Sequence, residues 1–273
     1  MTWPEQFVDI DFETTGLPRG CNPETGSFGQ HCPLFSERFR SRLIPRGEWS
    51  EIIQSLGPNY ERHKSWQYDQ RQEGTCTSQA GAGCYSYLAH KAFGIEIAPA
   101  PISLYKFCAP NPNSGSTTSC ILRRARDHGM LLIDTPENRA ILEALGLDPN
   151  HVLKATGYYQ KFPDGWQETA SQFKIDEFYE LGNVDEMFSA MLLGFDILYG
   201  RAGHAIHGVD VIEYKNSFAC EYDNSWGDWG RDGFGLDTYG YLHSRVGRYG
   251  AYAIQSIRSP DNLDFLLGDD WWK

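Results

Sequence analysis

The chain has 273 residues, of which 41% are hydrophobic and 22% charged, an ordinary composition for a globular protein with a sizeable core. Its formal net charge of −12 argues against nucleic acid as a partner, because an acidic surface repels phosphate backbones. No run of about 18 apolar residues is present, which excludes a membrane-spanning helix, and residues 1–11 lack the basic start of a secretory signal. We therefore expect no nucleic-acid or membrane partner, and a cytoplasmic or virion-associated location.

Seven cysteines are spread along the chain, too few for a disulfide scaffold, and their odd number leaves at least one free thiol. Their spacing leaves open whether Cys21 pairs with Cys32 and whether Cys108 pairs with Cys120. Two further cysteines lie among apolar neighbours and are expected to be plain buried thiols: Cys84 and Cys220.

The first part of the chain has a turn-rich composition. Residues 1 to about 43 are rich in Gly, Pro, Thr and Asn and predict one short strand, Phe7–Phe12, followed by loops. Pro45–Leu56 predicts a helix, which ends at Gly57-Pro58. We expect residues 1–60 to form an N-terminal extension packed permanently against the rest of the protein.

The next region is dominated by helices. Cys76–Phe93 predicts a helix with Gly94 as its C-cap. Gly81 and Gly83 are poor residues for an isolated helix, and they indicate that other backbone approaches this end closely. Shorter helices are predicted at 103–107, 120–128 and 137–145.

From about residue 153 short β-like segments alternate with turns. One helix is predicted at 184–193, and two strands at Ala205–Tyr214 and Phe218–Asp223. Helices followed by strands indicate an α+β fold. We expect two lobes, a helix-rich lobe over residues 61–152 and a strand-rich lobe over residues 153–273.

A set of polar residues with a common chemistry is distributed over these elements. Cys76 opens the long predicted helix, where unpaired N–H groups and the helix dipole favour a thiolate. Six residues earlier, Gln70 offers an amide that could join the Cys76 N–H in holding an oxyanion. His204 opens one predicted strand and Asn224 follows the next, so that an amide oxygen could fix the tautomer of an imidazole base. Trp226 could shield that hydrogen bond from water.

The chain resembles the papain-like (C1) family of cysteine peptidases in the order of these residues: Gln70, Cys76, His204 and Asn224, followed by Trp226-Gly. The histidine and asparagine lie 128 and 148 residues after the cysteine, close to the roughly 130–150 expected for that family. The resemblance spans about residues 65–240. It implies a helical lobe and a twisted β-barrel lobe with the active site in the cleft between them. It also implies hydrolysis of peptide bonds in a peptide or protein substrate through an acyl-enzyme, with no metal or cofactor.

Within this resemblance, Gln70 corresponds to the oxyanion glutamine and Trp226 to the tryptophan that shields the histidine–asparagine bond. Residues 44–49 also resemble phage-encoded and environmental bacterial relatives. The chain departs from the family at three places: Thr77 replaces a tryptophan, Glu73 replaces a cysteine, and residues 113–119 lack the Cys-Asn-Gly-Gly pattern that aligns substrate backbone. Glu73 is expected to oppose a thiolate nearby.

These departures motivate an alternative, a catalytically weak or inactive papain-fold module that serves as a structural or binding component. Such a module could belong to a virion or to another protein assembly.

A minor alternative comes from residues 9–17, which resemble the first metal-binding motif of DnaQ-like exonucleases, with Asp11 and Glu13 on a strand. The companion carboxylate motifs were not found, and the net charge opposes this function.

His207 is a second candidate base, but an odd offset from His204 on a strand points it to the opposite face. The other histidines have no companions at metal-ligand spacing: His31, His63, His90, His128, His151 and His243.

Overall fold

The computed structural model describes residues 8–9, 20–27, 29–56 and 66–258. Its helices are α1 (Phe35–Phe39), α2 (Trp49–Leu56), α3 (Cys76–Phe93), α4 (Ile102–Cys108), α5 (Thr118–Asp127), α6 (Pro136–Ala144), α7 (Trp166–Ala170), α8 (Val184–Leu192) and α9 (Tyr239–His243), with short 3₁₀ turns at Arg40–Arg42 and Arg46–Glu48. Its strands are β1 (Leu132–Ile133), β2 (Val152–Leu153), β3 (Ile175–Glu180), β4 (Asp196–Arg201), β5 (His204–Tyr214), β6 (Ser217–Asp223), β7 (Phe234–Thr238) and β8 (Ala251–Ile257).

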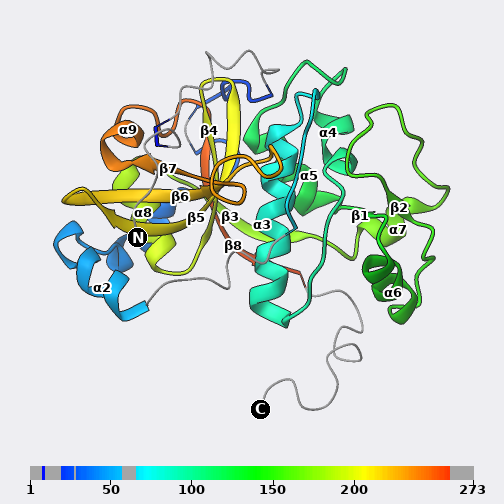
Figure 1. The fold of residues 1–273 in the computed structure, drawn as a ribbon, viewed down its shortest axis with the longest axis horizontal. Coiled ribbons are helices and arrows are strands. Elements are labelled where there is room, and N and C mark those ends of the chain that lie inside the picture. The colour runs from blue at the N-terminus through cyan, green and yellow to red at the C-terminus, as the bar shows by residue number, and fades with distance from the viewer. Residues whose placement is uncertain (1–7, 10–19, 28, 57–65, 259–273) are drawn as a thin grey trace.

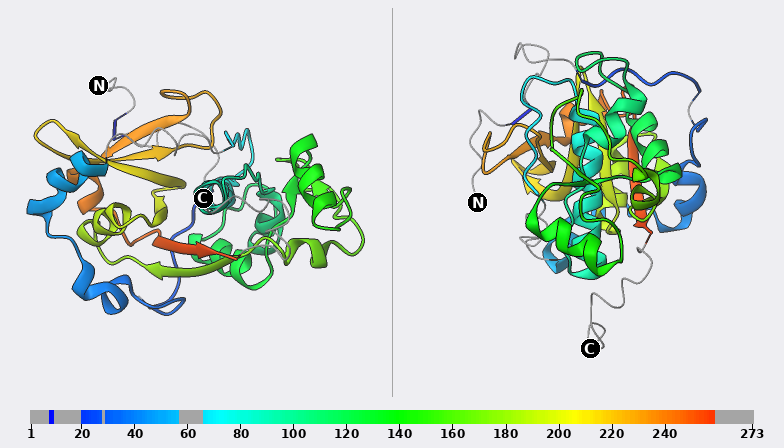
Figure 2. Two further views of the ribbon diagram at one scale, coloured as in Figure 1. Left: turned by 90° about the horizontal axis from the view of Figure 1, so that it is seen from below. Right: turned by 90° about the vertical axis from the view of Figure 1, so that its right-hand side faces the viewer.

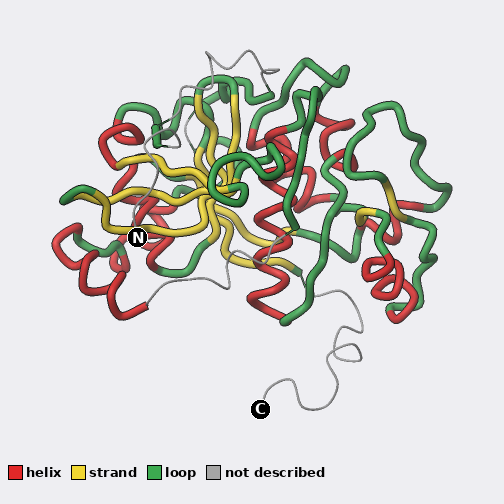
Figure 3. Tube along the Cα trace, viewed as in Figure 1, coloured by secondary structure: helices red, strands yellow, loops and turns green. Residues whose placement is uncertain are grey.

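The strands of the long sheet gather in one half of the molecule, whereas helices lie in both halves (Figure 3). Helices α4 to α7 and the short parallel pair β1–β2 occupy one half, and the long sheet with α2, α8 and α9 occupies the other (Figure 1). Helix α3 stands between them, and the views at right angles show the same division (Figure 2). Among the described helices, none is long and apolar enough to cross a membrane.

The sheet is antiparallel and has the strand order β3-β8-β4-β5-β6-β7. The turn between β5 and β6 places Lys215 and Asn216 at φ of 46° and 61°, as the two-residue hairpin turns that match strand twist require. The α+β fold is confirmed. In the part of the chain that the structure describes, the edge strands β3 and β7 do not pair, so the sheet is open and not the closed barrel implied by the resemblance.

Helix α3 is buried over most of its length. A Cβ at Gly81 would come within 2.9 Å of the Ile121 side chain, and one at Gly83 within 3.2 Å of His207 Nδ1. Both glycines therefore allow a close approach, although by side chains and not by the backbone that the sequence predicted. Gly94 ends the helix with a φ of 67°, as expected for a C-cap glycine.

The outer face of the sheet is covered by aromatic side chains from α1, α2 and α8. Trp49 on α2 is fully buried, and its ring centroid lies 5.4 Å from that of Phe188 on α8. Phe35 on α1 meets Phe195 edge to face at 5.2 Å. Burial of such rings contributes about 1.5–3 kcal/mol each, so residues 35–56 are part of the folded core.

A disulfide joins Cys108 at the end of α4 to Cys120 in α5, which settles the pairing that spacing left open. Cys21 and Cys32 are both free and buried, so the other candidate bridge is not formed.

Candidate active site

Cys76 is the first residue of α3 and its side chain is completely buried. Its Sγ accepts a hydrogen bond from the backbone N–H of Ala205 at 3.3 Å. Because Ala205 directly follows His204 on β5, this bond brings the start of the helix against the start of the strand. The thiol and the imidazole predicted from sequence therefore come from neighbouring pieces of backbone.

His204 is held in place from its far side. Its Nε2 lies 2.8 Å from Asn224 Oδ1, so the ring donates to the amide oxygen. The ring of Trp226 lies against the imidazole, with a centroid distance of 4.9 Å. Asn224 is 1% exposed, so this hydrogen bond is protected from water.

Gln70 is buried beside this group. Its backbone N–H donates to Ser225 O at 2.8 Å, and its Oε1 accepts from Ser225 Oγ at 2.7 Å. Its Nε2 donates one hydrogen to Glu73 O at 2.9 Å and carries a second N–H. The Gln70 amide is thus hydrogen-bonded to two segments, the one that follows Asn224 and the one that precedes Cys76.

Glu73 binds a loop of the helical half. Its carboxylate accepts the backbone N–H groups of Gly157 at 3.2 Å and Tyr158 at 2.9 Å. These hydrogen bonds stabilise the charge of the carboxylate and do not remove it, so its opposition to a thiolate at Cys76 stays a prediction.

Burial controls the protonation of the two reacting groups. It raises the pKa of the Cys76 thiol to about 12, against the opposing effect of backbone N–H groups from Ala205, Thr77, Cys76 and Gly20. Burial also lowers the pKa of His204 to about 3, although its hydrogen bond to Asn224 raises it. In this structure the pair is therefore a neutral thiol beside a neutral imidazole.

The cover over Cys76 is a segment from the N-terminal part of the chain, residues 20–24, here called the strap. Gly20 and Cys21 both donate their N–H groups to Gly203 O, at 3.0 and 3.3 Å. Ser116 N donates to Gly20 O at 2.9 Å, and Asn22 N donates to Ser116 O at 2.9 Å. The strap thus runs through the space between the helical half and the start of β5.

The strap is closely fitted at one end and anchored at the other. A Cβ at Gly20 would lie 2.5 Å from Cys76 Sγ and 2.6 Å from Gly74 O, so no side chain fits there. At the other end, the Glu24 carboxylate accepts from Thr118 Oγ1 at 2.7 Å, Ser119 N at 2.8 Å and Ser119 Oγ at 2.5 Å. These donors form the N-terminus of α5, where a negative charge is stabilised.

A second group lies deeper, where sequence reasoning expected only a plain thiol. Cys84, Asp196 and His207 are buried and offer ligand atoms within 4.8 Å of one another. Of the described residues, they alone form a group that could hold a metal ion. The signal in the sequence that could have indicated this group is the position of Cys84 about two helical turns after Cys76 on the same helix.

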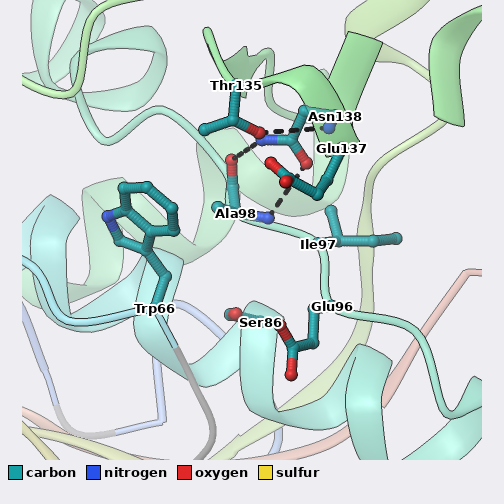
Figure 4. Close-up of a pocket in the computed structure, with 8 residues that line it drawn as sticks. All are labelled: Trp66, Ser86, Glu96, Ile97, Ala98, Thr135, Glu137 and Asn138. Atoms are coloured by element: carbon teal, nitrogen blue, oxygen red, sulfur yellow. Dashed lines mark hydrogen bonds between the residues drawn. The ribbon is translucent and has the colours of Figure 1, made fainter. Parts of the chain in front are cut away.

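Pockets are also found away from these residues. A pocket of about 380 Å³ lies on the helical half, lined by Trp66, Ser86, Glu96, Ile97, Ala98, Thr135, Glu137 and Asn138 (Figure 4). None of the predicted site residues lines it.

The exonuclease motif lies largely outside the described residues, including Asp11 and Glu13. Asp9 is described, and its carboxylate accepts from the backbone N–H and the hydroxyl of Thr238, both at 2.7 Å. These bonds tie it to the start of α9.

No family model matches the sequence, and no curated protein matches it either. Solved structures do. Xylellain, a cysteine protease from Xylella fastidiosa, is 17% identical with a TM-score of 0.60, over 89% of this chain and 97% of that chain. Digestive procathepsin L 3 of Tenebrio molitor larval midgut is 15% identical with a TM-score of 0.55, over 89% and 85%. The cysteine protease and lectin-like domains of Cwp84 from Clostridium difficile are 15% identical with a TM-score of 0.56, over 75% and 52%.

Proposed function

From the papain-like fold of this chain and the residues gathered in its cleft, we propose that it is a cysteine peptidase with Cys76 as nucleophile and His204 as base. The observation that carries the proposal is the pair of hydrogen bonds around His204. Asn224 Oδ1 holds Nε2 at 2.8 Å, and the next backbone N–H holds Cys76 Sγ at 3.3 Å. Cys76 and His204 are thus each oriented by a hydrogen bond to a third group.

In the proposed reaction, the thiol proton passes to His204 Nδ1 and Cys76 Sγ attacks the peptide carbonyl carbon. The oxyanion is held by the Cys76 N–H and by the second amide hydrogen of Gln70. The C–N bond breaks as His204 returns its proton to the leaving amine. Water then attacks the thioester carbonyl while His204 takes one of its protons, and the carboxylic acid and the thiol are released. Asn224 holds the ring throughout, and Trp226 excludes water from its hydrogen bond.

The strap supports a peptide ligand for this cleft. Ser116 uses both its N–H and its C=O to bind the strap backbone, as one strand binds another. A substrate chain could use the same two groups after the strap has left. The backbone of residues 113–119 can therefore align a peptide although its sequence lacks the family pattern.

Peptide hydrolysis is tested with the full chain and a peptide library, comparing the native protein with Gly20→Ala, which removes the fit of the strap. We expect cleavage by Gly20→Ala at a higher rate than by the native chain, and none by the double variant Gly20→Ala/Cys76→Ser. No cleavage by the folded Gly20→Ala protein over the whole library would contradict the proposal.

The second candidate is a binding or structural module without turnover, including a role in a virion or another assembly. The complete burial of Cys76 under the strap favours it. Under this alternative, Cys76→Ser retains the biological role and no variant with an open cleft hydrolyses peptides.

A further inference from the structure

The buried group around His207 is connected to every element that carries a candidate catalytic residue. Cys84 lies eight residues after Cys76 on α3, and His207 lies three residues after His204 on β5. Asp223 ends β6 immediately before Asn224, and it is the cross-strand partner of His207. Asp196 begins β4, the strand on the other side of β5.

The contacts in this group are short and directional. His207 Nε2 lies 2.6 Å from Asp196 Oδ1, and Nδ1 lies 3.9 Å from Asp223 Oδ2. The Cys84 thiol meets the same imidazole, and the Tyr87 ring lies 6.1 Å from it. Cys84, Asp196 and His207 are at most 1% exposed, and Asp223 is 7% exposed.

The nucleophile helix reaches this imidazole through a glycine. A Cβ at Gly83 would lie 3.2 Å from His207 Nδ1 and 3.9 Å from Asp223 Oδ2. The absence of a side chain at Gly83 therefore allows α3 to lie directly against the His207 ring at this point.

The group is charged at neutral pH. Burial lowers the pKa of His207, but Asp196 and Cys84 raise it more, and it stays well above its usual value. Burial raises the pKa of Asp223 to about 6, with His207 opposing. An imidazolium between carboxylates resists separation, because moving either partner away leaves a buried charge unpaired.

A hydrogen bond describes the Asp196–His207 contact better than a shared metal. The 2.6 Å between Nε2 and Oδ1 is the length of a strong hydrogen bond, whereas two ligands of a tetrahedral ion at about 2.0–2.2 Å would lie about 3.4 Å apart.

We propose that the His207 imidazolium is a positioning residue, which sets the helix of Cys76 against the strands of His204 and Asn224. His207 lies deeper than Cys76 and His204, and its contacts connect α3, β4, β5 and β6 at one point. The inference rests on the proposed function for its effect on catalysis. Displacements of about 1 Å in such sites cost up to about 100-fold in rate, so the effect is measurable.

The first test needs no turnover. Nitrogen NMR of the full chain with labelled histidine should show the His207 ring still protonated at pH values well above the ordinary histidine pKa of about 6.5. In His207→Gln, the Nε2–H signal of His204 in its bond to Asn224 should be lost or exchange faster. The matched control is His151→Gln, since His151 bonds Thr169 Oγ1 at 2.7 Å and pairs with an aspartate, Asp148, at 3.7 Å.

The second test measures catalysis at a temperature where each variant is folded. His207→Gln should lower kcat about 10- to 100-fold with KM changed by less than about twofold, and the double variant with Asp196→Asn should recover stability and part of kcat. A neutral His207 ring at neutral pH, or an unchanged His204 signal in folded His207→Gln, would overturn the inference even if His207→Gln alone is too unstable for kinetics. Absence of turnover in folded Gly20→Ala together with a changed His204 signal would leave the inference standing and count against the peptidase.

Discussion

Replacing Gly20 with alanine is expected to open the cleft while leaving the fold intact. The strap lies directly on Cys76, and the missing side chain of Gly20 is what allows it to do so. An added methyl group would lie 2.5 Å from Cys76 Sγ, closer than carbon and sulfur approach without repulsion. The strap, and not the sheet or α3, is the part that can move to relieve this contact.

The size of the effect follows from the contacts. Four backbone hydrogen bonds join residues 20–22 to Ser116 and Gly203, and at about 1 kcal/mol each they favour the closed strap. Overpacking by one methyl group costs about 1–3 kcal/mol. That cost is applied to the closed state alone, so the open population should rise about 5- to 150-fold.

Iodoacetamide labelling followed by mass-spectrometric mapping measures this population. In Gly20→Ala, Cys76 and Cys21 should be labelled faster by the same factor, while Cys84, which is not under the strap, should stay protected. The control is Gly47→Ala, because no atom lies within 4 Å of a Cβ at Gly47. Unchanged labelling of Cys76 in folded Gly20→Ala would refute the reasoning, and simultaneous labelling of Cys84 would show global unfolding instead.

Three further predictions concern the anchor, the histidine and the disulfide. Glu24→Gln should weaken the strap, because it removes a charge at the N-terminus of α5, and Cys76 labelling should rise several-fold, with the native chain approaching the variant at high salt. The pKa of His204 is about 3 in the folded protein and about 6.5 in the unfolded chain, so below pH 6.5 the unfolded chain binds a proton that the folded protein does not. The free energy of unfolding should therefore drop by up to about 5 kcal/mol as the pH falls from 6.5 towards 3. His204→Gln should flatten this part of the stability curve. A slope equal in both proteins would contradict it. Replacing Cys108 and Cys120 together with serine should lower the free energy of unfolding by about 3 kcal/mol, measured in urea, and no change would show that the bridge is absent in solution.

Local patterns were sufficient for much of the fold. The long helix at Cys76–Phe93 and its Gly94 cap were predicted at their observed ends, because periodicity and capping depend on residues close in sequence. The hairpin through Lys215 and Asn216 was predicted for the same reason. The order of the catalytic candidates also predicted a papain-like fold, since each stands at the end of an element where a rigid backbone can aim it.

Contacts between distant segments were decided only by the tertiary structure. Three such contacts join residues whose spacing in the sequence does not predict them. They are the packing of Gly20 against Cys76, the hydrogen bond between Glu73 and Tyr158, and the disulfide between Cys108 and Cys120. The same holds for the charged group at His207, whose partners come from three other elements. Sequence determined which side chains could react and on which elements they stand. Only packing decided which of them are buried together, and burial is what sets their protonation and covers the nucleophile.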